Sequence, residues 1–169
     1  MRVSTDASEL EALIAWLQHQ RDHALGILDG LTETQLRQVA LPSGWSCLEM
    51  MAHLVALERF WFCAVVAGNP AAAEAPEGDP RDWRVPEGMT APEVFAAYRR
   101  QAAVTDAILR ETSLDAAPAW WPVELFGEWR LASVRDVVLH TLTETAGHTG
   151  HLDAARELID GRQWLVLEA

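Results

Sequence analysis

Residues 133–161 read SVRDVVLHTLTETAGHTGHLDAARELIDG, and this stretch decides the fold. Its first four residues, Ser133 to Asp136, have the spacing of a capping box, a signal that begins many helices. A largely apolar stripe with the 3.6-residue period of an α-helix follows, and its members are Val137, Val138, Thr141, Leu152, Ala155 and Ile159. Gly161 comes directly after the last periodic turn, where helices commonly end. The stretch therefore predicts one long helix with a single buried face.

Three further segments carry the same period between the same kinds of ends. The first covers residues 10–28, the second is capped at Ser46 and runs to about Ala67, and the third is capped at Thr90 and continues through Leu109. A capping box also predicts a short helical turn at residues 32–35.

Two connections lack any helical period. Residues 68–89 are rich in Ala, Pro, Glu and Gly, and residues 113–131 carry several tryptophans, so both are predicted to be irregular crossover loops. Residues 164–167 are predicted to form a short extended tail. Four long helices around one core predict an all-α fold, a four-helix bundle with long crossover loops, formed by residues 1–169 as a single domain.

The charge and the cysteines restrict the partners and the compartment. The chain has 13 Lys+Arg against 25 Asp+Glu, a net charge of −12, which disfavours nucleic acid and anionic membrane surfaces as partners. The sequence lacks both the apolar core of a signal peptide and a run of about 18–20 apolar residues that would span a membrane. Cys47 and Cys63 are interpreted as buried, reduced thiols, so we expect a cytoplasmic protein.

A carboxylate and three imidazoles share one side of the last predicted helix. At about 100° per residue, Glu144, His148, His151 and His140 fall within an arc of roughly 80° that overlaps the buried face. Such groups are costly in a dry core unless something compensates them. Two interpretations stay open: the side chains bond one another or face a solvated groove, or a neighbouring pair of them binds a metal ion. One ion cannot use the whole row, because His140 and His151 lie about 16 Å apart along the axis.

A further ligand for such an ion would come from another helix. His53 lies on the flank of the apolar stripe of the second predicted helix, and by itself it is interpreted as a core histidine with satisfied hydrogen bonds. Together with Glu144 and His148 it would form a three-ligand set that leaves open positions, as a catalytic divalent site requires. His19 and His23 form a rival pair with i, i+4 spacing on the first helix, where a solvated face is favoured.

Two segments resemble the DinB-like metal-binding four-helix bundle family, in its actinobacterial branch. Residues 48–62, LEMMAHLVALERFWF, resemble the second helix of that family, which carries a single metal-ligating histidine, and residues 140–161 resemble its last helix. Many relatives have His-x-x-x-His followed by Gly-Gln there, whereas this chain has Glu144 and His148 followed by Gly150-His151. The similar domain of mycothiol-dependent maleylpyruvate isomerases uses a His, Glu and His set. The resemblance thus implies His53, Glu144 and His148 as metal ligands, with His151 in the second shell or lining the pocket.

The resemblance also implies an activity. The second domain of the isomerases has no counterpart here, so single-domain bundles that transfer a low-molecular-weight thiol are the better template. They imply a metal-dependent transferase that adds a mycothiol-like thiol to small electrophiles, with a divalent ion, Zn(II) before Ni(II) or Fe(II), and a homodimer. Four tryptophans are candidates for walls of the cleft, namely Trp45, Trp120, Trp121 and Trp129. The alternative is a non-catalytic bundle with a vestigial metal pocket that acts as a stress-linked binding protein.

Overall fold

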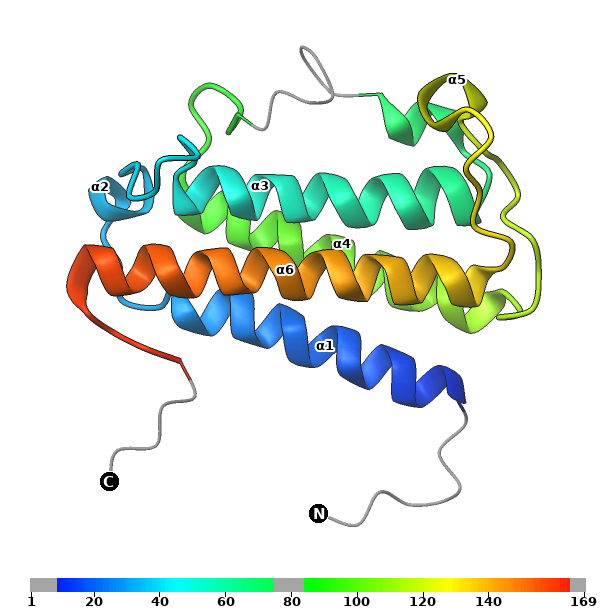
Figure 1. Cartoon of the computed structure of the whole chain (residues 1–169), viewed down its shortest axis with the longest axis horizontal. Helices are drawn as coiled ribbons and strands as arrows, with labels where there is room; N and C mark the ends of the chain where they lie inside the picture. The colour runs from blue at the N-terminus through cyan, green and yellow to red at the C-terminus, as the bar shows by residue number, and fades with distance from the viewer. Residues whose placement is uncertain (1–8, 75–83, 165–169) are drawn as a thin grey trace.

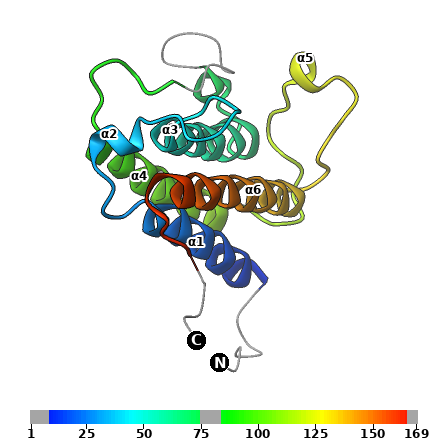
Figure 2. The same cartoon turned by 60° about the vertical axis from the view of Figure 1, so that its left-hand side comes forward.

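Four long helices form the frame of the molecule (Figure 1). The structure, a computed structural model, describes residues 9–74 and 84–164. Within them the long helices are α1 (Glu9–Ile27), α3 (Cys47–Glu58), α4 (Ala91–Glu111) and α6 (Val134–Asp160). The oblique view in Figure 2 shows the four helices arranged as a bundle, in which α1 packs on α6 and α3 packs on both α4 and α6. The all-α bundle predicted from the helical periods is confirmed.

The predicted capping boxes all form. In each, the side chain of the third helical residue accepts a hydrogen bond from the N-cap backbone N–H, and the pairs are Thr32 with Gln35, Ser46 with Glu49, Thr90 with Glu93 and Ser133 with Asp136. The first of these begins the short α2 (Glu33–Leu36), and Gly161 ends α6 with a φ of 78°. That φ lies in the left-handed region, which glycine adopts without strain.

The second predicted helix is continuous, but its last turns are wider than an α-helix. At Arg59 α3 passes into η1 (Arg59–Val66), a π-helix in which hydrogen bonds reach one residue further along the chain. The Ala67 N–H donates to the Phe62 carbonyl at 2.9 Å, five residues back. The Trp120 N–H in the second crossover donates to the Val65 carbonyl at 3.1 Å, so this crossover is anchored to the π-helix.

Both predicted crossovers contain a short helix that the sequence pattern did not predict. They are η2 (Pro70–Ala73), of 3₁₀ type, and α5 (Val123–Phe126), which stands at the upper right of Figure 1 and whose Phe126 ring stacks on that of Trp61 in η1. The predicted extended tail lies outside the described residues except for Trp164. Within the described ranges the chain forms no strand, only an isolated bridge between Val39 and Ser46.

A buried ionic group joins three of the long helices. Arg21 of α1 donates to both carboxylate oxygens of Glu58 in α3, at 2.8 and 2.7 Å, and to Asp106 of α4 at 2.8 Å. Arg21 and Glu58 are almost completely buried, so each charge depends on the other for its stability.

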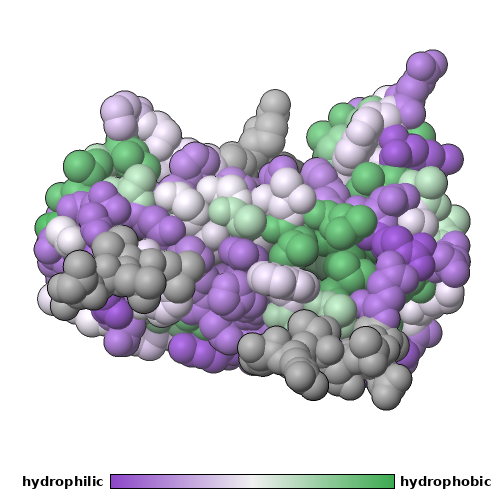
Figure 3. Space-filling model, turned by 60° about the horizontal axis from the view of Figure 1, so that its bottom comes forward, coloured by the Kyte–Doolittle hydropathy of each residue, from purple (hydrophilic) through white to green (hydrophobic). Residues whose placement is uncertain are grey.

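The surface is mixed in character. Figure 3 shows polar residues over much of the face that carries α1, with an apolar patch among them and further apolar residues toward both ends of the molecule. None of the helices in the described segments is both long and apolar enough to cross a membrane.

Candidate metal centre

Two histidines from different helices meet in the groove between α3 and α6. The two helices run side by side in opposite directions (Figure 1), and His53 in the middle of α3 lies opposite His148 of α6. Their Nε2 atoms are 3.1 Å apart, and the two rings cross at 79°. The structure therefore brings together the pair that the sequence assigned to one site.

Their surroundings keep both rings neutral. Burial, and then the nearby His148, lower the pKa of His53 to about 4. Burial also lowers the pKa of His148, with the Glu144 carboxylate opposing this effect and His151 adding to it. Neutral imidazole is the form that can share a proton within the pair or bind a metal ion through its ring nitrogen.

Glu144 lies at the solvent edge of the pair. Its Oε2 is 3.9 Å from His148 Nε2, and its side chain is 44 % exposed, against 12 % for His148. The sequence predicted that this row overlaps the buried face. His148 is largely buried and Glu144 is half-buried, so both lie at the edge of the buried face, whereas His151 is exposed and the predicted overlap is wrong for it. The predicted stripe members Thr141 and Leu152 do form the buried face of α6.

The two histidine nitrogens have the separation that a shared divalent ion requires, but no third ligand is in place among the described residues. Two nitrogens that share such an ion at about 2.0–2.1 Å stand roughly 2.9–3.4 Å apart, depending on the angle at the metal, and the observed 3.1 Å lies in this range. As they stand, no three His, Cys, Asp or Glu side chains in the described part of the chain form a metal-binding group. Glu144, with its Oε2 3.9 Å from His148 Nε2 and a half-exposed side chain, is the candidate third ligand.

Trp45 and His151 flank the pair on the side toward the start of α3. The Trp45 indole lies 5.9 Å from the His53 ring and 5.8 Å from the His148 ring, between centroids. His151 lies one turn further along α6, with its ring 6.0 Å from that of His148. Trp45 thus covers the side of the pair toward the start of α3, whereas Glu144 lies one turn before His148 on the other side.

His140 does not take part in this pair. It lies two turns earlier on α6, about 12 Å away, where its ring contacts Trp61 at 4.8 Å and Trp129 at 5.6 Å. Trp121 and Phe126 complete this aromatic cluster. Two of the predicted wall tryptophans, Trp121 and Trp129, therefore lie in the cluster, whereas Trp45 contacts the histidine pair.

The two histidines of the rival pair on α1 differ in burial. His19 is exposed, as predicted. His23 is buried, its Nε2 lies 2.8 Å from an oxygen of Asp153, and its ring stacks on Trp164. The predicted solvated face is therefore wrong for His23, because the chain beyond α6 returns to cover it.

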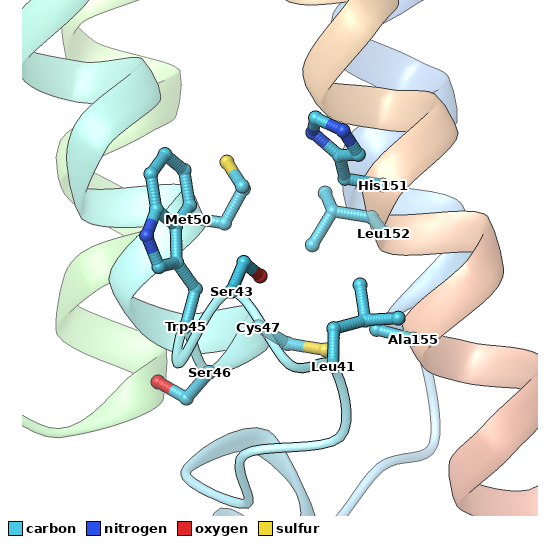
Figure 4. A pocket seen from close by; sticks show the side chains of 9 residues that line it. All are labelled: Leu41, Ser43, Trp45, Ser46, Cys47, Met50, His151, Leu152 and Ala155. Atoms are coloured by element: carbon cyan, nitrogen blue, oxygen red, sulfur yellow. The ribbon is translucent and has the colours of Figure 1, made fainter.

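A small pocket that the sequence did not reveal opens beside Trp45 and His151 (Figure 4). It has a volume of about 70 Å³ and lies between the start of α3, the preceding loop and α6. The sequence could not reveal it, because the loop at residues 41–46 has no pattern that fixes where it folds against α6.

The comparisons with known proteins agree with this architecture. The all-α bundle is the fold of a DinB-like protein. The family described as Mycothiol-S-transferase matches residues 12–161, and the chain belongs to this family. A search of curated proteins finds no match.

Proposed function

We propose that this protein is a metal-dependent transferase that adds mycothiol, a low-molecular-weight thiol, to small electrophiles. The observation that carries the proposal is the meeting of the His53 and His148 Nε2 atoms, 3.1 Å apart, in a chain of the Mycothiol-S-transferase family. Family membership supports the thiol, and the histidine pair supports the metal.

Three side chains would hold the ion, each in a different way. His53 and His148 supply neutral nitrogens from two helices, and Glu144 supplies a carboxylate from the solvent edge. Two imidazoles and one carboxylate are a common ligand set of catalytic zinc, so Zn(II) is the proposed ion. When bound, it would lower the pKa of a thiol enough to hold it as the thiolate near neutral pH.

The chain's own residues would organise the transfer. The open edge at Glu144 gives a polar thiol access from solvent, while Trp45 shields the other end of the pair from water. In the reaction the thiol gives its proton to solvent, its sulfur forms a bond to the electrophilic carbon, and the leaving group departs with the electrons of the bond that breaks.

The metal content of purified variants tests the ligand set. We expect about one divalent ion per chain in the unaltered protein, and a loss of metal affinity of at least about tenfold in His53→Ala and in His148→Ala. His19→Ala is the matched control, because this histidine is exposed on α1. Elemental analysis after dialysis measures the content and identifies the ion, and tight binding retained by both site variants would overturn the ligand set.

Turnover tests the transferase activity separately. The metal-loaded protein is incubated with mycothiol and a small alkyl halide, and the thioether product is measured by mass spectrometry. We expect product that depends on both the metal and the thiol. A protein that binds metal but forms no product with several thiols and electrophiles would instead be a non-catalytic binding bundle.

A further inference from the structure

Most of the wall of the pocket beside the histidine pair is apolar, and its three polar members are Ser43, Ser46 and His151. Figure 4 shows side chains from the start of α3, from the preceding loop and from α6 around one small space. The apolar members of its lining are Leu41, Trp45, Cys47, Met50, Leu152 and Ala155. Cys47 belongs to this group because burial raises the pKa of its thiol to about 11, so that it is uncharged at neutral pH.

The pocket lies next to the proposed metal centre along the same groove. Met50 is one turn before His53 on α3, and Leu152 is one turn after His148 on α6, so the pocket begins about 5 Å from the pair. Trp45 belongs to both, because it lines the pocket and contacts both imidazoles. A group in the pocket would therefore lie close to a sulfur atom held at the pair.

The size of the pocket restricts what fits. An apolar cavity of about 150 Å³ accommodates a benzene ring, whereas this pocket has less than half of that volume. If the number of carbon atoms scales with volume, the pocket accommodates about three of them. A thiol such as a sugar conjugate is too large for a space of about 70 Å³, so it would have to stay outside the pocket.

We propose that this pocket is the subsite for the electrophile, and that it selects a short unbranched alkyl group of up to about three carbons over an aromatic ring. The inference rests on the proposed function and adds the substrate class to it. A primary alkyl halide illustrates the fit: its alkyl tail enters the pocket, its first carbon stays near the pair, the C–S bond forms and the halide leaves with the C–X electron pair.

Methyl NMR of methionine tests the pocket without turnover. The probe is 1-chloropropane, added to the metal-loaded protein labelled with ¹³C at the methionine methyl groups. We expect the Met50 signal to shift with saturation while the Met89 signal stays in place, and chlorobenzene to produce no comparable shift at Met50. The pocket would be excluded as a propyl site if Met50 does not respond to 1-chloropropane.

Substitutions on α6 provide the matched pair. Ala155→Leu fills the pocket and should abolish the Met50 shift, whereas Ala154→Leu adds the same atoms at an exposed position and should preserve it. Leu41→Ala, in the loop, enlarges the pocket and should allow chlorobenzene to shift Met50, which keeps the test informative if Ala155→Leu does not fold. Equal behaviour of the Ala154 and Ala155 variants would overturn the assignment.

Kinetics link the pocket to the reaction. With 1-bromopropane as electrophile, Ala155→Leu should raise its KM at least tenfold and change the KM for mycothiol by less than twofold. If Ala155→Leu turns over 1-bromopropane with an unchanged KM, the subsite proposal is wrong but the transferase proposal still holds. If the Met50 signal shifts with saturation but no product forms, the transferase proposal is wrong and the pocket is only an apolar binding site.

Discussion

Two imidazole rings that meet at 3.1 Å, as those of His53 and His148 do, cannot both be protonated at low cost. Burial and mutual proximity hold both neutral, and the same two factors prepare them to bind a cation. In the metal-free protein this arrangement makes stability depend on pH, because the folded state resists a proton that the unfolded chain accepts.

The pH dependence of stability follows from the lowered pKa of His53. That pKa is about 4 in the folded protein, against an ordinary value of 6.5. Between these values the unfolded state binds more protons, so the free energy of unfolding rises with pH and is lost as pH falls. We expect the metal-free protein to lose about 1–2 kcal/mol between pH 7 and pH 5 through this residue.

Urea denaturation in the presence of a chelator measures this loss. His53→Asn is the comparison, because it keeps a polar side chain but has no group that titrates in this range. The variant should show a smaller loss of stability between the two pH values, and equal losses in both proteins would contradict the assignment.

The helical period predicted which of these residues share a face, but not how deep each would lie. Glu144 and His148 are four residues apart, so their common side followed from geometry alone. The depth of Glu144 depends on how closely α3 approaches that turn of α6, which no local pattern encodes. His23 was misplaced for the same reason, since Trp164, which covers it, is distant in the sequence.

At the scale of the helices, the least predictable feature is the change from α3 to the π-helix η1. Residues 60–66 are an unbroken apolar and aromatic run, and nothing in such a run marks where the hydrogen-bond register changes. By contrast, α3, α4 and α6 each begin at a capping box, and α6 ends at a glycine with a positive φ, so those positions were predictable.

The change of register comes directly after Glu58, the carboxylate paired with Arg21. Arg21→Met would leave this carboxylate buried without its cation, and we expect a loss of about 3–5 kcal/mol in the free energy of unfolding. The double variant Arg21→Met/Glu58→Leu should lose much less than the two single changes together, because it removes both charges.

The control for this prediction is Arg135→Ala. Arg135 pairs with Glu9 and Asp115 at the surface, and such pairs contribute no more than about 1 kcal/mol. Denaturant unfolding of the unaltered protein, both single variants, the double variant and Arg135→Ala tests this prediction, and a loss in Arg21→Met no larger than that in Arg135→Ala would show that the buried pair is dispensable.

For the molecule as a whole, side chains in the last turns of α6 and just after it join α6 to α1. Arg156 donates to the carbonyls of Ile27 and Asp29, and Arg162 donates to the same Asp29 carbonyl. Beyond α6 the chain turns back along the bundle (Figure 1), and Trp164 stacks on His23 with ring centroids 4.9 Å apart. These contacts fix α6 against α1. They therefore also fix the helix that carries Glu144 and His148 of the proposed metal centre.

Gly26 is what allows Trp164 to approach α1 so closely. A Cβ atom built at Gly26 would stand only 2.5 Å from the indole, so Gly26→Ala must displace Trp164 and lose its packing.

Gly147→Ala, in the middle of α6, is the matched control because a Cβ there meets nothing within 4 Å. The control should gain about 0.5–1 kcal/mol in the free energy of unfolding through its better helix propensity. Gly26→Ala should gain nothing or lose stability, and a gain equal to that of Gly147→Ala, with an unchanged His23 ring signal in NMR, would show that Trp164 does not pack on α1.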